Sequence, residues 1–188
     1  MRYSFYILAC LFLFNQAVAQ DKKSKKDTVA KTVYSEIVKV DSSNRYELFK
    51  KASKWVESQG FKIEEEDPYG GKIVAKNKFE VYTDKGVLAK PNGSFTHDVI
   101  IDIKEGKYRY TFSNFMYSYI KQDRTYKYVT VKGQKPMEEN NAPGWKKQWG
   151  KNKMQVSNKI NAYIVSLRET MKYVAPKPVA PPKPKEEW

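Results

Sequence analysis

The sequence predicts one α+β domain: a curved antiparallel sheet of about five strands with two helices packed on one face. Three patterns lead to this prediction. Residues 95–104 and 107–112 alternate apolar and polar side chains with a period of two, whereas residues 44–59 and 152–173 repeat apolar side chains at helical spacing. The resulting order is strand, helix, four or five strands, helix, so each helix can bury its apolar stripe against one sheet.

The first two elements have clear boundaries. Val33 to Val40 is rich in β-branched residues and is expected to form a strand. Asn44 is a suitable N-cap for the helix that follows, with Glu47 at the capping-box offset, and Gly60 is a suitable left-handed C-cap. The apolar stripe of this helix consists of Leu48, Ala52, Trp55 and Val56.

The next strands are expected at residues 61–66 and 72–82, joined by the turn Pro68-Tyr-Gly-Gly71. Residues 83–94 contain Gly, Pro and Asn-Gly and are expected to form a loop or short hairpin. The fourth strand begins at Phe95 and turns at Glu105-Gly106 into the fifth. In the fifth strand the aromatic positions change parity, which predicts a β-bulge near Asn114.

The remaining chain is less regular. Thr125 to Val131 is a possible further strand in a basic insertion at about 121–150, of which residues 136–150 are expected to be a loop. The last helix has the stripe Met154, Ile160, Tyr163, Ile164, Leu167 and Met171. Pro176 ends it, and residues 175–188 form a Pro/Lys-rich tail expected to be disordered and extended.

The N-terminus has the three parts of a secretory signal peptide. Arg2 precedes a short apolar core, and Ala17-Val-Ala19 predicts cleavage before Gln20. The apolar core is shorter than the roughly 20 residues of a membrane anchor, and lipoprotein processing at Cys10 would leave too short a core before the cut. The chain is therefore expected to be exported to the periplasm or cell envelope, or secreted, with a flexible Lys-rich leader at 20–32 and one domain at 33–174.

The composition restricts the chemistry and the partners. Cys10 is the only cysteine and lies in the signal peptide, so thiolate catalysis and zinc–thiolate sites are excluded in the exported form. The net charge of +14 favours anionic envelope partners, namely lipid headgroups, lipopolysaccharide or cell-wall polymer, although a solvated basic surface without a dedicated partner explains the charge as well. An envelope protein is an alternative partner, export argues against nucleic acid, and no later stretch is long and apolar enough to span a membrane.

No catalytic residue, cofactor site or metal site is expected. His97 is the only histidine, and Asp98 beside it points to the opposite face of its strand, so His97 is interpreted as a core-edge residue. The acidic run Glu64 to Asp67 lacks the spacing of a calcium loop, and Gly70-Gly71-Lys72 lacks that of a phosphate-binding loop.

Aromatic side chains interleaved with cations are the best candidates for a binding surface. Such residues can stack on bases or sugars, although cross-strand packing within the sheet is the simpler interpretation. Two tryptophans in the basic insertion can similarly contact a membrane interface or pack on the domain. The candidate residues are Tyr108, Arg109, Tyr110, Tyr117, Tyr119, Trp145 and Trp149.

The chain resembles an exported bacterial family described as a domain of unknown function with a TATA-binding-protein-like fold. Packing and turn residues over about 33–174 carry this resemblance: Glu47-Leu-Phe49 to Lys54-Trp55, Gly70 to Val74, the hairpin Asp98 to Phe112, and Ser166 to Met171. It implies the fold and no catalytic or binding residues, and likeness to the TATA-binding protein does not imply DNA binding.

These observations predict a noncatalytic accessory or binding module of the envelope. The first alternative is a carrier of an apolar small ligand, held between the sheet and the C-terminal helix, which requires a cavity there. The weakest alternative is a hydrolase that uses His97.

Overall fold

The computed structural model describes residues 30–41, 43–83, 89–140 and 146–172. The expected signal peptide, most of the leader and the Pro/Lys-rich tail lie outside these residues, as does Trp145.

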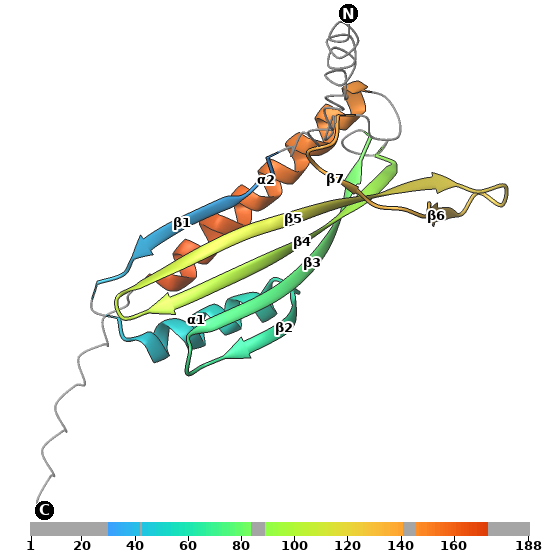
Figure 1. Ribbon diagram of the computed structural model, residues 1–188. Helices are drawn as coiled ribbons and strands as arrows, with labels where there is room; N and C mark the ends of the chain where they lie inside the picture. The colour runs from blue at the N-terminus through green and yellow to red at the C-terminus, as the bar shows by residue number, and fades with distance from the viewer. Residues whose placement is uncertain (1–29, 42, 84–88, 141–145, 173–188) are drawn as a thin grey trace, which may run out of the picture.

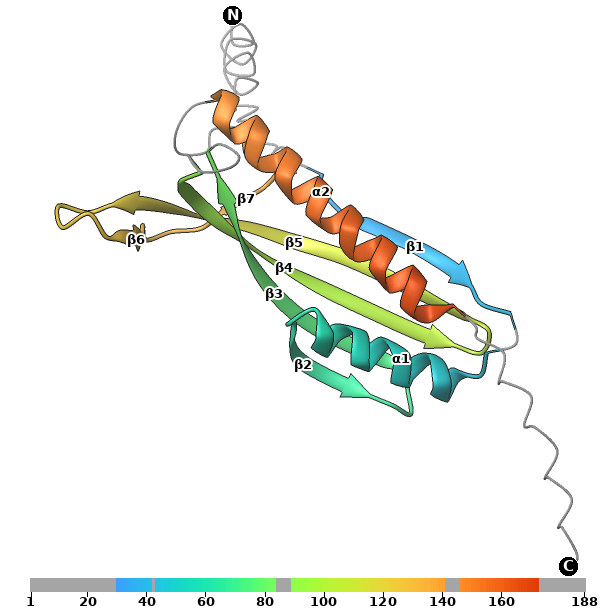
Figure 2. The same cartoon turned by 180° about the vertical axis from the view of Figure 1, so that it is seen from behind.

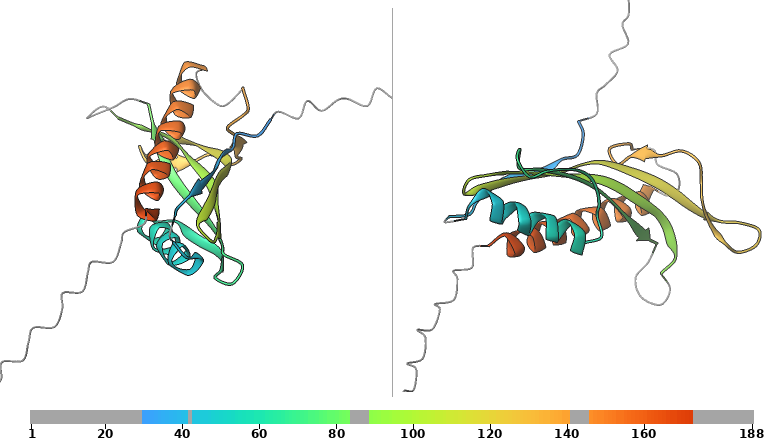
Figure 3. Two further views of the ribbon diagram at one scale, coloured as in Figure 1. Left: turned by 90° about the vertical axis from the view of Figure 1, so that its left-hand side faces the viewer. Right: turned by 90° about the horizontal axis from the view of Figure 1, so that it is seen from below.

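The domain is a single antiparallel sheet with two helices on one face (Figure 1, Figure 2). The five long strands lie in the order β1-β5-β4-β3-β2, and two short strands, β6 and β7, each pair with β5. Figure 3 (right) shows α1 and α2 beneath the same face of the curved sheet, as the sequence predicts. The elements are β1 (Tyr34–Lys39), α1 (Arg45–Ser58), β2 (Lys62–Asp67), β3 (Lys72–Tyr82), β4 (Pro91–Lys104), β5 (Lys107–Gln122), β6 (Tyr128–Thr130), β7 (Lys135–Pro136) and α2 (Lys146–Met171).

Both ends of α1 are closed by the residues that the sequence indicates. Asn44 Oδ1 accepts a hydrogen bond of 2.8 Å from the Glu47 backbone N–H, which satisfies one free donor of the first turn. Gly60 adopts φ 71°, and the N–H groups of Gly60 and Phe61 reach back to the carbonyls of Glu57 and Val56. This pair of bonds is a Schellman motif, which explains why the helix ends here.

The bulge expected near Asn114 is present. Thr96 pairs with Met116 and Asp98 pairs with Ser113, so two residues of β5 stand opposite His97 alone. Asn114 takes up the extra length at φ 58°. The bulge shifts the parity of β5, so Phe115 and Tyr117 stay on the helix side where Tyr110 and Phe112 also point.

Aromatic rings fill the space between the sheet and α2. Phe95 stacks on Trp149 at 5.8 Å, and Phe112 stacks on Tyr163 at 6.4 Å between ring centroids. The indole N–H of Trp55 in α1 donates to Ser166 Oγ of α2 at 3.1 Å, which joins the two helices. The core is thus a continuous layer of packed side chains under the sheet.

Three local expectations need correction. β4 begins at Pro91, four residues earlier than expected, where it pairs with Tyr82 of β3. α2 begins at Lys146, six residues earlier than the apolar stripe indicated. Trp149 and Asn152 are buried in the added turns, whereas Met154 is 56% exposed. Tertiary packing of Trp149 offsets the low helix propensity of the glycine that follows it.

The long helix α2 is polar on its outer side. None of the helices in the described parts of the chain is long and apolar enough to cross a bilayer.

Candidate functional site

The structure places most of the expected aromatic binding surface inside the core. Tyr108, Tyr110 and Tyr117 are only 1%, 3% and 1% exposed. All three lie on the helix side of β5, the face of the sheet against which α1 and α2 pack. The expectation of an exposed stacking surface is therefore wrong for these three rings, and packing within the domain explains them.

The other candidates are distributed over the molecule. Tyr119 is partly buried at the edge of the core, whereas Arg109 is exposed on the opposite face of the sheet. Trp149 packs edge-on against Tyr117 at 5.0 Å, and its indole N–H donates to the carbonyl of Glu139 at 2.7 Å. Trp149 thus holds the start of α2 against the sheet rather than facing a partner.

A cleft of about 600 Å³ lies between β1 and the C-terminal end of α2. We call it the β1–α2 cleft. Its lining combines an apolar wall with charged groups of both signs: Glu36, Val38, Lys39, Val40, Asp41, Tyr108, Arg168 and Lys172.

Strand pairing positions one wall of this cleft. Glu36 lies directly opposite Tyr110, and Val38 lies directly opposite Tyr108, in the antiparallel register of β1 and β5. Directly paired residues point to the same face, so all four side chains leave the sheet on the side of the helices. The C-terminal turns of α2 then bring Arg168 to Glu36 across 132 positions of sequence.

A hydrogen-bond network ties the two walls together. The Tyr110 hydroxyl donates to Glu36 Oε2 at 2.7 Å, and the Arg168 guanidinium pairs with the same oxygen. The hydrogen bond from Tyr110, with the bond and charge of Arg168, lowers the pKa of Glu36 below its usual value. Glu36 is thus held as a carboxylate, and its role here is to orient Arg168.

Tyr108 differs from its neighbour Tyr110. Its hydroxyl is buried and has no hydrogen-bond partner among the described residues. Burial raises the pKa of Tyr108 to about 12, so the group stays a neutral O–H donor over the physiological range. A buried donor without an acceptor costs about 1–3 kcal/mol, so the position calls for an acceptor supplied from the cleft.

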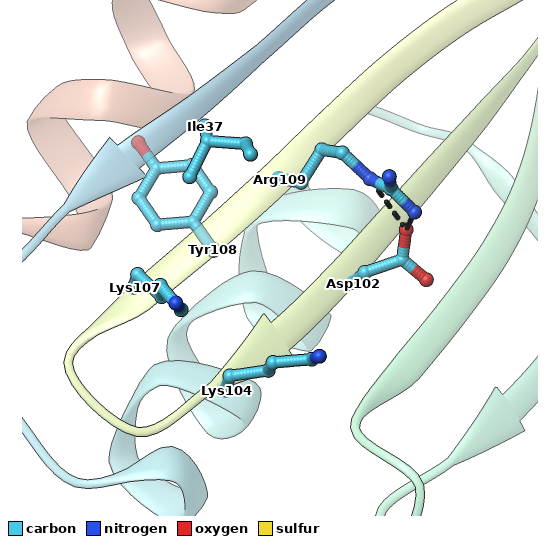
Figure 4. Close-up of a pocket in the computed structure, with 6 residues that line it drawn as sticks. All are labelled: Ile37, Asp102, Lys104, Lys107, Tyr108 and Arg109. Atoms are coloured by element: carbon cyan, nitrogen blue, oxygen red, sulfur yellow. Dashed lines mark hydrogen bonds and ion pairs between the residues drawn. The ribbon is translucent and has the colours of Figure 1, made fainter.

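The outer face of the sheet has a smaller hollow of about 170 Å³ at the end of the β4–β5 hairpin (Figure 4). Arg109 spans it and donates to Asp102 Oδ2 at 2.7 Å. Figure 4 shows the Tyr108 ring and the Arg109 guanidinium pointing in different directions from β5. Ile37, Lys104, Lys107 and Tyr108 complete this hollow, so Tyr108 contributes both to it and to the β1–α2 cleft.

His97 lies in the core rather than at its edge. It is 0% exposed, neither ring nitrogen has a partner in the described structure, and burial lowers its pKa to about 4. The rings that surround it at centroid distances of 5.6–6.0 Å are Phe61, Phe79, Phe112, Phe115 and Tyr163. His97 therefore cannot exchange a proton with a substrate in solution.

The acidic run at the end of β2 is structural. Glu64 pairs with Lys76 at 2.9 Å and Glu65 pairs with Lys72 at 3.2 Å, while Asp67 Oδ1 accepts the backbone N–H groups of Tyr69 and Gly70. Within the described ranges, no group of three His, Cys, Asp or Glu side chains could hold a metal ion.

The comparisons with known proteins agree with this fold. Residues 34–118 match the sequence model of the family described as "Domain of unknown function (DUF4468) with TBP-like fold". This part of the chain is similar to a DUF4468 domain. The DUF4468 match spans β1 to most of β5, and β6, β7 and α2 extend beyond it.

Two crystal structures are similar in fold. A DUF4468 family protein from Bacteroides ovatus superposes with a TM-score of 0.57 at 10% identity, covering 79% of this chain and 90% of that one. A TBP-like protein from Parabacteroides distasonis has a TM-score of 0.52 at 15% identity, covering 73% and 93%. At these identities the likeness concerns the fold alone. No curated protein matches the chain.

Of the residues in the β1–α2 cleft that sequence reasoning missed, only Glu36 has a recognisable sequence signal. Glu36 is a charged residue at an inward-facing position of β1, in phase with the partly buried Tyr34 and Val38. Such a break in an otherwise apolar face is a signal for a polar contact on that face, here the half-exposed pair of Glu36 with Arg168.

Proposed function

We propose that this chain is an exported, noncatalytic binding module that acts in the periplasm or cell envelope. In this proposal the β1–α2 cleft binds an anionic, hydrogen-bond-accepting group, such as a carboxylate or phosphate, of an envelope component. The signal-peptide pattern of residues 1–19 supports export, and the basic composition of the chain supports an anionic partner.

The observation that carries the proposal is the Tyr108 hydroxyl. It is a neutral donor that lacks an acceptor among the described residues, and it lines a cleft with the cations Lys39, Arg168 and Lys172. Arg168 is paired with Glu36 and Lys172 with Glu169, and the three cations outnumber the two acids of the lining, Glu36 and Asp41. An acceptor with negative charge would satisfy the hydroxyl and would be attracted by these cations. Val38 and Val40 offer an apolar wall for the part of the ligand next to the anionic group.

The structure disfavours the two alternatives. A carrier of an apolar ligand requires an apolar cavity between the sheet and α2, but Phe95, Trp149 and Tyr117 fill the space under the first turns of α2 with ring contacts of 5.0–5.8 Å. The two clefts at the borders of this space, the β1–α2 cleft and one of about 570 Å³ between β3 and α2, are lined largely by polar and charged side chains. A hydrolase built on His97 requires an accessible imidazole, and His97 is sealed in the core. Binding is therefore better supported than transport or His97-dependent hydrolysis.

The test is an NMR titration of the chain from Gln20 onward, first with inorganic phosphate and then with acetate. Saturable amide shifts are expected around the β1–α2 cleft. Tyr108→Phe removes one oxygen atom and should abolish this saturation while the protein stays folded, because the oxygen has no partner in the described structure. Tyr46→Phe, at a residue 71% exposed on α1, is the matched control and should bind like the wild type.

Two results would overturn the proposal. One is the absence of saturable shifts in the cleft with either anion. The other is unchanged binding in Tyr108→Phe. Export has a separate test: the chain recovered from the periplasm of a Gram-negative host should have Gln20 as its N-terminal residue, and an uncleaved cytoplasmic chain would contradict export.

A further inference from the structure

The far end of β5 extends beyond the rest of the sheet. The pairing of β5 with β4 ends at Tyr119, and the following residues, Ile120–Gln122, pair only with β6. Figures 1 and 2 show this two-stranded arm projecting away from both helices. We define the β5–β6 arm as residues 120–132. A two-stranded ribbon without a covering layer is only marginally stable in water, so the core does not explain this extension.

The arm has a strong positive charge. Its four cations are Lys121, Arg124, Lys127 and Lys132, and its one acid is Asp123, which leaves a net charge of +3. None of these cations has an ion-pair partner among the residues that the structure describes, whereas Lys72, Lys76 and Arg109 on the sheet are paired.

The acid of the arm builds the turn at the tip. Asp123 Oδ1 accepts hydrogen bonds from the Thr125 N–H at 2.7 Å, the Thr125 hydroxyl at 2.8 Å and the Lys127 N–H at 2.9 Å. These bonds shape the turn while the cations on either side stay exposed.

Exposed aromatic and apolar side chains accompany the cations. Tyr126 at the tip is 82% exposed, and Tyr128 and Val129 are 46% and 38% exposed. Tyr126 adopts φ 59°, a left-handed conformation that Gly or Asn occupies at lower cost. The local backbone therefore disfavours an aromatic residue at this position, and the ring makes no compensating contact in the core. This combination indicates a role outside the folded domain.

We propose that the β5–β6 arm docks on the surface of an anionic lipid bilayer. Its four unpaired cations match the negative charge of lipid headgroups. Tyr126, Tyr128 and Val129 match the interfacial layer beneath the headgroups, where amphipathic rings are favoured. A soluble polyanion offers the charge but no such apolar layer, so the exposed tyrosines favour a bilayer. This inference does not depend on the β1–α2 cleft, which lies at the C-terminal end of α2 and shares no residue with the arm.

The experiment measures partitioning of the chain from Gln20 onward into two kinds of vesicle. This form lacks the expected signal peptide and retains every described residue. One kind contains phosphatidylcholine alone, and the other contains phosphatidylcholine mixed with phosphatidylglycerol. Binding is expected with the anionic vesicles at low salt, and it should weaken as salt screens the charges.

Paired variants distinguish the arm from the overall basic charge. Arg124→Gln with Lys127→Gln should weaken partitioning about 30-fold, or about five-fold per cation. Lys50→Gln with Lys54→Gln removes the same charge from the exposed side of α1 and should change partitioning much less. Tyr126→Asn suits the left-handed backbone and should also weaken binding, whereas Tyr69→Asn, at a residue 88% exposed on the β2–β3 turn, should not.

Three outcomes would overturn the inference. The first is an equal loss in the arm and α1 charge variants, which would show diffuse attraction. The second is equal partitioning into neutral and anionic vesicles. The third is arm-dependent binding to dextran sulfate without binding to anionic vesicles, which would assign the arm to a polymer. Unchanged partitioning in Tyr108→Phe separates this test from that of the cleft.

Discussion

Acidification should destabilise this protein through His97. The imidazole is fully buried among five aromatic rings, and neither nitrogen has a hydrogen-bond partner in the described structure. Burial lowers its pKa from the ordinary value of 6.5 to about 4, because nothing in this cage compensates a positive charge. The unfolded chain therefore binds a proton at a higher pH than the folded protein does.

The sign and the size of the effect follow from this difference. Between pH 6.5 and about 4 the unfolded state carries more protons than the folded state, so stability falls as the pH falls through this window. The shift corresponds to about 3 kcal/mol at 1.36 kcal/mol per pH unit. Above pH 6.5 the imidazole is neutral in both states, so His97 causes no loss of stability there.

The assay compares urea unfolding of the wild type, His97→Phe and His97→Leu at pH 7 and pH 4, followed by the fluorescence of the buried tryptophans. Other groups titrate in all three proteins, so the wild-type loss should exceed that of each variant by about 3 kcal/mol. His97→Leu serves as a second nontitrating variant in case the larger Phe strains the cage. A difference between wild type and variants that stays constant from pH 7 to pH 4 would refute the reasoning.

Three further predictions concern stability and are checked by thermal or urea unfolding. A Cβ on Gly93 would lie 2.3 Å from Cε2 of Tyr117, so Gly93→Ala should lower the free energy of unfolding by about 1–3 kcal/mol. Gly150 faces open space on α2, so Gly150→Ala should raise this free energy by up to about 1 kcal/mol. Equal effects at the two sites would contradict this prediction. Asn44→Ala removes the N-cap of α1 and should cost about 1 kcal/mol, and an unchanged midpoint would show that the cap is dispensable. Truncation after Ala175 should leave Tm nearly unchanged, and a loss of several degrees would show that the Pro/Lys-rich tail packs on the domain.

Local patterns were sufficient for much of the fold. The Asn44 cap and the Gly60 C-cap of α1 depend on neighbouring residues only, and both are confirmed. The bulge at Asn114 could be predicted because a change of parity in an aromatic strand requires an extra residue. The start of α2 could not be predicted, since the contacts of Trp149 with Phe95 and Tyr117 are long-range.

The candidate site was much harder to predict. The sequence singled out Tyr108 and Tyr110, and both contribute to the β1–α2 cleft or its supporting network, but as buried residues rather than as an exposed platform. Arg168 was missed, because an ion pair across 132 positions has no local signal, and Glu36 showed only as a charged residue on the inward face of β1. Tyr126 and Tyr128 were not among the candidate residues, because no local pattern distinguishes exposed tyrosines of an arm from tyrosines packed under the sheet.

The amino-acid sequence by itself determined the α+β class, the order of the long elements and their caps and turns, because hydrophobic period and backbone preferences act over a few residues. Only the tertiary structure decided which side of the sheet is covered. A period of two defines two faces of a strand but does not say which one the helices bury. For the same reason the roles of the aromatic residues, the sealing of His97 and the assembly of the β1–α2 cleft depended on long-range packing.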